Sequence, residues 1–264
     1  MSNPSAAPIF FFDNSDTQMQ RAYEQARGTF RYFWRELSWE SRRIVPGLDL
    51  ACVKAPFSDD APPGTVREES QVEQMWVNDV VFDGQAIYGT LITSPQWLKS
   101  VAAGHQVRLP LGGISDWMYC IRDHVYGAFT VNLMRSRMNP NERAEHDAAW
   151  GLDFGDPNLI ELIPPGANGS AADLNADHPM ALNMGDSLAQ YLQKDPVNVH
   201  SADDRGWTLL HHQSLAGSPT CVQVLLQHGA DPNARTQQGM TPLALAQSLG
   251  WAQVAQLLVA AGAR

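Results

Sequence analysis

The last third of the chain contains the same short pattern twice, and this repetition constrains the fold more than any other feature. Asp204–His211 reads Asp-Arg-Gly-Trp-Thr-Leu-Leu-His, and Gln237–Ala244 reads Gln-Gln-Gly-Met-Thr-Pro-Leu-Ala. The glycines, Gly206 and Gly239, are 33 residues apart, and so are the threonines that follow them. A fixed period of about 33 residues indicates a repeat array, in which each unit buries its apolar face against its neighbours. Such arrays present binding surfaces, so the pattern favours a chain that works by contact rather than by catalysis.

Each unit predicts a turn, two short helices and a glycine stop. The turn glycine supplies backbone freedom, and the threonine precedes the first helix, where its hydroxyl can satisfy unpaired amides. Pro242 suits the first position of a helix. The second helices carry an apolar stripe with i, i+3, i+4 spacing, and they end at Gly229 and Gly262. We align the stripe residues of the two units as Val222, Leu225 and Leu226 with Val254, Leu257 and Leu258.

These residues resemble the ankyrin repeat. The resemblance rests on the turn Gly-x-Thr, on His211, on Thr241-Pro242-Leu243 and on the closing Gly-Ala pairs, whereas Leu209 and Ala244 depart from the pattern. It implies repeats at 204–236 and 237–264, with a degenerate first repeat at 178–203 that acts as a cap. It also implies that the turns and the inner helices carry the contacts to a protein partner.

Composition limits the other classes of function. A length of 264 residues allows two domains, and the formal net charge of −10 disfavours nucleic acid as a ligand and favours a basic protein partner. Cys52, Cys120 and Cys221 form no CxxC motif and no paired framework, which suits a reducing compartment. We find neither a signal peptide nor a membrane-spanning stretch, so we expect a cytoplasmic protein.

The N-terminal part predicts an α+β domain at 1–155 with a mainly antiparallel sheet and flanking helices. We expect helices at 13–39, 94–103 and 139–150 and strands at 48–57, 72–82, 85–92, 105–109, 114–121 and 125–134. Asp83-Gly84 is the turn of a hairpin. The segment 156–177 is rich in Gly, Pro, Asn and Ala and is expected to be a linker that leads to the all-α array at 178–264.

A second resemblance covers residues 15–135. Met75-Trp76-Val77 and Ile114-Ser115-Asp116-Trp117 look like a bacterial domain of unknown function typified by YegJ-like proteins. This resemblance implies a fold family and no established activity.

Several polar residues of this domain are candidates for function. Asp116 lies among large apolar residues, where an unpaired carboxylate is costly, so it is either a binding carboxylate or a structural acceptor of N–H groups. Cys120 and His124 suggest a thiol and a base, but no third group completes them, and we predict no catalytic residue. Glu69 and Glu73 belong to an acidic stretch that is either a solvated face or a patch for a basic partner.

In the repeats we predict partner contacts at Trp207, Arg235, Met240 and Trp251, because aromatic, Met and Arg side chains are enriched at interfaces. The alternative for Trp207 is packing on the neighbouring repeat. His211 and His212 are adjacent in a helix and point about 100° apart, so they do not share a metal ion. No phosphate-binding loop is present, and no cofactor or metal is predicted.

Two functional hypotheses follow. The first is a non-catalytic protein-binding module, in its most concrete form an antitoxin or immunity-type inhibitor of a bacterial toxin or effector. The alternative is a small-ligand-binding or enzymatic N-terminal domain, with Asp116, Tyr119, His124 and Glu73 lining a pocket and the repeats as a targeting arm. A convergent pocket would favour the second hypothesis.

Overall fold

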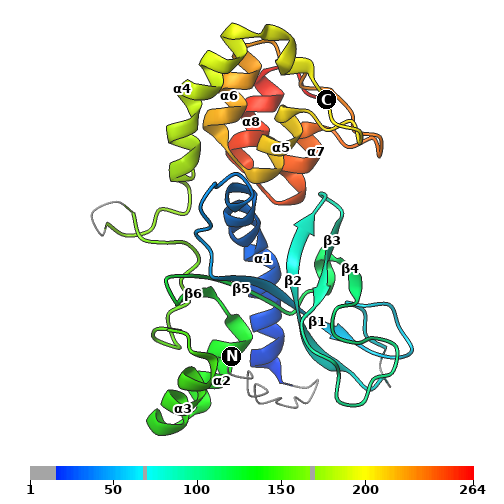
Figure 1. The fold of residues 1–264 in the computed structure, drawn as a ribbon, viewed down its shortest axis with the longest axis vertical. Helices are drawn as coiled ribbons and strands as arrows, with labels where there is room; N and C mark the ends of the chain where they lie inside the picture. Colours follow the sequence, from blue (N-terminus) through cyan, green and yellow to red (C-terminus); the bar gives the residue numbers. More distant parts are fainter. Residues whose placement is uncertain (1–15, 68–69, 167–169) are drawn as a thin grey trace. The chain divides into compact units, whose positions relative to one another are not determined.

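The structure is a computed structural model that describes residues 16–67, 70–166 and 170–264 (Figure 1). Contacts divide the chain into two compact units, Met1–Phe33 with Arg43–Ala167 and Trp34–Arg42 with Asn168–Arg264. The division after residue 167 falls inside the predicted linker 156–177. Each unit is described by itself below.

The first unit is built on a six-stranded sheet with the order β4-β3-β2-β1-β5-β6, in which every neighbouring pair is antiparallel. This confirms the predicted class, an antiparallel sheet with flanking helices. The elements are α1 (Thr17–Glu40), β1 (Leu50–Phe57), β2 (Glu73–Phe82), β3 (Ala86–Leu91), β4 (Gln106–Pro110), η1 (Leu111–Gly113), β5 (Asp116–Ile121), β6 (His124–Gly127), α2 (Phe129–Arg137) and α3 (Pro140–Trp150).

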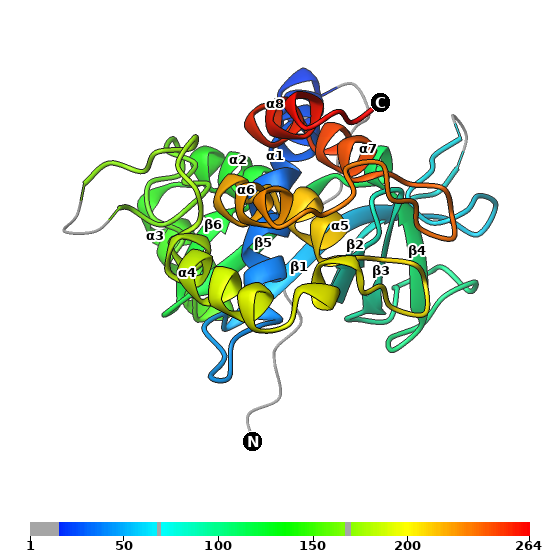
Figure 2. The same cartoon turned by 90° about the horizontal axis from the view of Figure 1, so that it is seen from above.

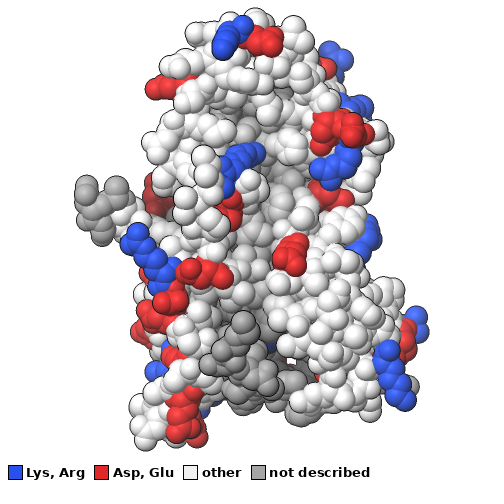
Figure 3. All heavy atoms as spheres, in the orientation of Figure 1, with Lys and Arg blue, Asp and Glu red and all other residues white. Residues whose placement is uncertain are grey.

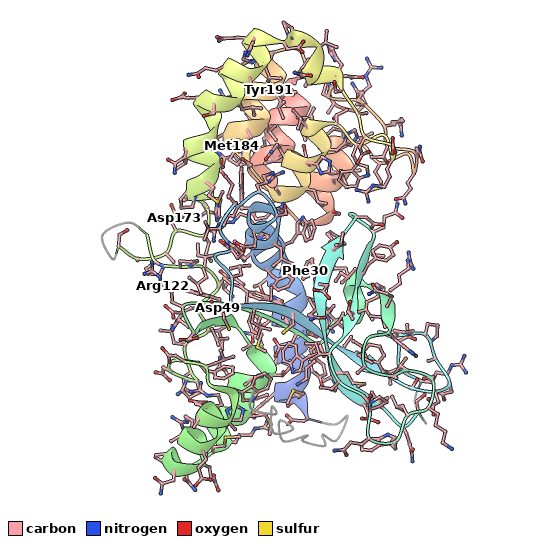
Figure 4. The ribbon with its side chains drawn as sticks, in the orientation of Figure 1. Phe30, Asp49, Arg122, Asp173, Met184 and Tyr191 are labelled. Atoms are coloured by element: carbon pink, nitrogen blue, oxygen red, sulfur yellow. The ribbon has the colours of Figure 1, made fainter. Side chains whose placement is uncertain are left out.

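Helix α1 covers one face of the sheet with an apolar stripe of helical period. The ring of Phe30 meets that of Phe82 at 5.5 Å between centroids, and Phe33 meets Trp117 at 5.8 Å. Figure 4 shows Phe30 between the helix and the strands. The indole of Trp117 donates to the backbone carbonyl of Ala26 at 2.8 Å, so a buried polar atom is satisfied where the helix crosses the sheet.

The opposite face has a second core over β1, β5 and β6. Trp150, at the end of α3, packs edge-on against Trp76 at the margin of this core. On the β3 and β4 half of the same face, Tyr88 and Arg108 are exposed, as expected for an antiparallel sheet with one solvated surface. The buried residues of this core are Cys52, Met118, Cys120, Val125, Ala128, Val131 and Phe154.

The predicted helix at 94–103 is wrong, because this segment is a loop held by carboxylates from elsewhere in the sequence. The two carboxylate oxygens of Glu73 accept from the backbone N–H groups of residues 96, 97 and 98 at 2.9–3.1 Å. Asp59 accepts from the N–H groups of residues 99 and 100. Side chains therefore satisfy the amides that a helix would have paired internally.

The predicted strand at 125–134 is also wrong in its second half. Strand β6 ends at Gly127, and α2 begins at Phe129 after two residues with positive φ, +80° at Gly127 and +56° at Ala128. Asp116 accepts from the N–H groups of Phe129 and Thr130 and so caps the helix from the neighbouring strand. No local sequence pattern signals this cap.

The second unit is a helical array over residues 179–260, which confirms the predicted all-α class of this part and is consistent with ankyrin repeats. Helices α4, α6 and α8 contact one another in succession, and α5 contacts α7 in a second row (Figure 2). The elements are α4 (Pro179–Lys194), η3 (Pro196–His200), α5 (Leu209–Ala216), α6 (Pro219–Gln227), α7 (Pro242–Ser248) and α8 (Ala252–Ala260).

The 33-residue period continues through the second helices. Leu225 in α6 and Leu258 in α8 are both fully buried, and both helices are followed by a glycine with positive φ, Gly229 and Gly262. The alignment of Leu225 with Leu257 is therefore wrong by one residue, because Leu257 is only partly buried. A stripe of consecutive apolar residues does not by itself decide which of them faces the core.

The C-terminal end of α1 belongs to the second unit. Trp39 is fully buried, and its ring stacks on His178 at 5.5 Å with an interplanar angle of 9°. The guanidinium of Arg42 lies 4.7 Å from the Trp39 ring centroid, and Glu36 pairs with His178 at 3.2 Å. Residues 34–42 thus supply core contacts beside the first repeat helix, α4, in addition to the residues of the predicted cap.

Candidate protein-binding surface

The first exposed turn of the array, residues 203–208, is organised by Asp203. Its carboxylate accepts from the N–H groups of Arg205 at 2.9 Å and Trp207 at 2.8 Å. The backbone of Asp203 also donates to the carbonyl of Trp207 at 2.9 Å, and Gly206 has a φ of +78°. A side chain with a larger volume than glycine's would strain this backbone conformation, so the sequence Asp-x-x-Gly specifies the turn.

The second turn, residues 236–240, repeats this geometry with a threonine in place of the aspartate. The N–H of Thr236 donates to the carbonyl of Met240 at 3.0 Å, and the Thr236 hydroxyl accepts from the N–H of Met240 at 3.1 Å. Gly239 has a φ of +78°, the same value as Gly206. The two turns are therefore equivalent in backbone shape.

The turns are bonded to each other. The backbone N–H of Gln237 donates to the carbonyl of Arg205 at 2.9 Å, and its side-chain amide donates to the carbonyl of Asp204 at 2.6 Å. These two bonds join the tips of consecutive repeats into one surface. The Arg235 guanidinium donates to the carbonyl of Gly239 at 3.0 Å, so we call residues 203–208 and 235–240 together the turn surface.

His211 supports the turn surface from beneath. Its Nε2 donates to the carbonyls of Ala234 at 3.1 Å and Met240 at 3.2 Å, while Nδ1 accepts from the N–H of Thr208. Burial lowers the pKa of His211, although the two carbonyls oppose this shift. A neutral imidazole with its proton on Nε2 satisfies all of these bonds, which gives His211 a structural role in the repeat.

The four predicted contact residues of the repeats differ in exposure. Arg235 is exposed, and Met240 is partly buried. Trp207 is buried and packs on the His212 ring at 5.0 Å. Trp251 is buried as well, and its indole N–H donates to the carbonyl of Leu215 at 3.2 Å. The two tryptophans therefore serve mainly as packing residues, while Arg235 and part of Met240 remain accessible to solvent.

Sequence reasoning missed further members of the turn surface. Arg205 has a side chain that is 63% exposed, and Asp204, Gln237 and Gln238 are exposed beside it. The sequence could have identified these four residues, because they lie in the same two turns as Trp207 and Met240 and the tips of repeat turns face solvent.

The acidic candidates of the first unit are mostly engaged inside it. Glu73 and Asp116 are buried, so they offer no surface to a docked protein, and we remove them from the proposed surface. Asp60 accepts from the Ser70 hydroxyl, and Asp83 accepts from the N–H groups that follow it in the β2–β3 turn. Glu69 lies outside the described residues.

Asp116 has four hydrogen bonds and no exposed surface. It accepts from the N–H of Trp117 at 2.9 Å, Phe129 at 2.9 Å and Thr130 at 2.8 Å, and from the Thr130 hydroxyl at 2.5 Å. Burial raises the pKa of Asp116, and the positive charge of Lys54 and the hydrogen bonds oppose that shift. The structure thus gives this carboxylate the role of a structural acceptor.

The residues of the alternative pocket do not converge on one another. Glu73 serves the loop at 96–98, Asp116 caps α2, and the Tyr119 hydroxyl donates to the carbonyl of Leu162 at 3.0 Å. The two ring nitrogens of His124 are engaged by carboxylates rather than by the Cys120 thiol. Burial raises the pKa of Cys120 to about 12, which disfavours a thiolate.

Two further features of the described residues bear on other functions. Within residues 16–67, 70–166 and 170–264, no group of three or more His, Cys, Asp or Glu side chains is arranged to hold a metal ion. In the same residues, no helix is both long and apolar enough to cross a membrane. On the face in Figure 3, acidic and basic side chains lie intermingled.

Comparison with protein families places both units. The family described as "Uncharacterized protein conserved in bacteria (DUF2314)" matches residues 16–154, and the family of ankyrin repeats in three copies matches residues 178–264. Both resemblances seen in the sequence are thereby confirmed. Ankyrin repeats imply a role in protein–protein interaction, so the second unit has such a role.

Individual relatives agree with this division. The chain is similar to NMB1133/NMB1171 of Neisseria meningitidis serogroup B, named as an ankyrin repeat protein, with 42% identity over 250 residues that cover 95% of this chain and 96% of that protein. It is also similar to YegJ of Escherichia coli K12, with 29% identity over 84 residues, covering 32% of this chain and 49% of YegJ. Protein phosphatase 1 regulatory subunit 27 of Mus musculus is 31% identical over 78 residues, covering 30% of this chain and 51% of that subunit. The match therefore spans about half the length of each of the last two relatives.

Proposed function

Because the chain belongs to the bacterial DUF2314 family and carries ankyrin repeats, we propose that it captures one protein partner on its turn surface and inhibits that partner, in the manner of an antitoxin or immunity protein. The observation that carries the proposal is the pair of bonds from Gln237 to the carbonyls of Arg205 and Asp204, at 2.9 and 2.6 Å. These bonds make a preformed surface from two consecutive repeats.

A preformed surface supports tight binding because little conformational entropy is lost when the partner docks. Arg205 and Arg235 are exposed on it, and Met240 is partly exposed in the second turn. Arginine and methionine are enriched in the centres of interfaces, and an arginine can bind a carboxylate or a carbonyl through several N–H groups. These residues are the anchors of the proposed complex.

The charge of the partner follows from two contributions. The net charge of −10 attracts a basic protein over long distances and raises the rate of encounter. The turn surface itself carries both signs, with Asp203 and Asp204 beside the two arginines. We therefore propose a partner with overall positive charge and an acidic or carbonyl-rich contact site.

Inhibition is supported by the character of the surface and by one relative. A rigid surface that docks as a body can cover an active site without chemistry of its own. The relative in Mus musculus is named a regulatory subunit of a phosphatase, which is a protein that acts through another protein. We propose the same mode of action here, with a toxin or effector as the regulated protein.

The test is affinity capture from a lysate of the native bacterium with the full chain as bait. We expect the double variant Arg205→Ala/Arg235→Ala to bind the captured protein at least about ten-fold more weakly, because truncated interface arginines commonly cost more than 1 kcal/mol each. The double variant Arg21→Ala/Arg67→Ala changes the net charge equally at exposed sites of the first unit and is expected to bind like the original chain.

Inhibition requires a separate measurement. The captured protein is purified, its activity is measured with and without the chain, and its toxicity is scored in cells that express it alone or with the chain. Equal binding by both double variants would reject the turn surface. Full activity of the captured protein in a saturated complex would reject inhibition and leave the binding role intact.

A further inference from the structure

The segment after α3 wraps around the edge strand β6 of the first unit. The N–H of Val125 donates to the carbonyl of Asp153 at 2.9 Å, and the N–H of Gly127 donates to the carbonyl of Glu161 at 2.8 Å. Between these two points the chain leaves the edge, and Phe154 enters the core formed by α2 and the sheet. We call residues 153–163 the strap.

The far end of the strap lies on the side of the sheet that α1 covers. The carbonyl of Leu162 accepts from the hydroxyl of Tyr119, whose ring stacks on Trp117, and Ile163 is buried. Trp117 in turn bonds to α1 through its indole N–H. The strap therefore passes from one face of the sheet to the other around β6 and occupies the outward N–H groups of that strand.

His124 joins both ends of the strap. Its Nδ1 lies 3.0 Å from Oδ2 of Asp153, and its Nε2 lies 2.6 Å from Oε2 of Glu161. A neutral imidazole has one N–H and can donate to only one of these carboxylates, whereas an imidazolium donates to both. The arrangement thus requires a protonated ring to be complete.

We propose that His124 is a pH-dependent clasp, which holds the strap across the edge of β6 while its ring is protonated and loosens the strap when the proton is lost. This regulatory device lies in the first unit and is independent of the turn surface. It concerns the carboxylates of Asp153 and Glu161, whose side chains are 68% and 41% exposed, and a histidine that is 30% exposed. Partial exposure keeps all three groups in contact with solvent protons.

The surrounding charges agree with a protonated ring. The strap contributes the two carboxylates, and Asp123 lies in the adjoining turn with its N–H bonded to the carboxylate of Asp49. Figure 4 shows Asp49 and Arg122 at this end of the sheet. The two charges that act on the ring itself, those of Asp153 and Glu161, are both negative. The other groups packed nearby are Tyr126, at 5.0 Å from the ring, and Arg135 of α2, whose charge acts on Asp153.

The direction of the pH response follows from these contacts. Burial alone would lower the pKa of His124, but the hydrogen bonds and charges of Asp153 and Glu161 outweigh it and raise the pKa above its ordinary value of 6.5. A histidine with a raised folded-state pKa stabilises the closed strap fully below pH 6.5, and this contribution is lost as the pH rises through the raised value. The strap is therefore closed in acid and loosened in alkali.

Opening has a defined consequence for the surface. Release of the strap frees the N–H groups of Val125 and Gly127, and it exposes Phe154 and Ile163, which are buried in the closed state. An uncovered sheet edge pairs readily with another strand. The clasp thus controls access to the β6 edge of the sheet.

Amide hydrogen exchange on the full chain tests the clasp. Protection factors, which correct for the intrinsic pH dependence of exchange, are measured at Val125 and Gly127, while the His124 ring is titrated by NMR. We expect both protection factors to fall roughly five-fold across the His124 titration, a size set by partly exposed ion pairs. The variant His124→Gln is expected to show low protection without that transition.

Two further variants keep the test decisive. Glu161→Gln retains the histidine and removes one carboxylate, so the transition should move to lower pH even if His124→Gln does not fold. His105→Gln, which changes an exposed histidine that accepts from the N–H of Ala102, should leave the transition unchanged. Constant protection in the unmodified chain while His124 titrates, or an unshifted transition in Glu161→Gln, would overturn the proposal.

Discussion

Replacement of Asp116 by asparagine distinguishes a structural carboxylate from a functional one. The carboxylate accepts four hydrogen bonds and lies opposite Lys54 in the register of β1 and β5. Asparagine keeps one acceptor oxygen and places an NH₂ group against two of the four donors. Because the side chain is fully buried, water cannot replace the lost bonds.

The size of the effect follows from these contacts. Each buried donor without an acceptor costs about 1–3 kcal/mol, and a buried charge that loses its partner costs about 3–5 kcal/mol. The two contributions overlap, since Lys54 acts on the carboxylate through its charge and donates to the same Thr130 hydroxyl that bonds it, so we expect a loss of about 3–5 kcal/mol for Asp116→Asn. For a unit of this size that corresponds to a fall in Tm of roughly 10 °C.

Differential scanning calorimetry is the appropriate assay, because a chain with two units does not unfold in a single two-state step. The transition of the first unit is expected to move, while capture of the partner at low temperature is retained. Asp79→Asn makes the same chemical change at an exposed residue of β2, and its effect should stay within about 0.5 kcal/mol. A variant that melts like the original chain but loses the partner would refute the structural role.

Two other substitutions test local packing and charge. Gly217→Ala is expected to lower the free energy of unfolding of the second unit by roughly 3 kcal/mol, because φ is +68° and a Cβ would lie 2.2 Å from the Trp251 ring. Gly229→Ala is the control: φ is positive there too, but the space is open, so the loss measured by chemical denaturation should be only about 1 kcal/mol. Asp147→Asn leaves the buried guanidinium of Arg135 unpaired and should cost about 3 kcal/mol near neutral pH. Burial would raise the pKa of Asp147, but hydrogen bonds to Arg135 and His146 lower it below 3.8, so the stabilisation is present above that value and is lost as the pH falls. The stability curves of the variant and the original chain should therefore converge in acid, and a constant difference down to the lowest pH would contradict this assignment.

Local sequence patterns predicted the elements whose conformation depends on neighbouring residues. The hairpin around Asp83-Gly84, the helix that begins at Pro140 and the two repeats with their turn glycines all lie where the sequence placed them. In each case the residues that signal the element lie within a few residues of the element itself. Hydrophobic period and turn chemistry are sufficient there, because no distant group competes for the backbone N–H groups.

The predicted secondary structure at 94–103 and 125–134 is wrong because side chains distant in sequence accept hydrogen bonds from the backbone N–H groups of these segments. Glu73 and Asp59 hold the loop at 94–103, and Asp116 starts α2 in the middle of the predicted strand. Glu73, which belongs to the acidic stretch that suggested a docking patch, is used in this way. The sequence shows where acidic residues occur, but only the folded structure determines whether their carboxylates are exposed to solvent or accept hydrogen bonds from backbone amides.

The sequence by itself determined the division into an α+β domain and an ankyrin array, because both depend on short-range periodicity and on residues that tolerate positive φ. Tertiary structure alone decided which charged residues remain exposed. It also decided that Trp39, at the C-terminal end of α1, packs in the core of the repeats against His178. In the same way, only the folded chain brings His124 to two carboxylates that lie 29 and 37 residues further along the sequence. The physical reason is that burial and hydrogen-bond partners are properties of positions in space. Residues far apart in sequence acquire them only when the sheet edge and the strap come together.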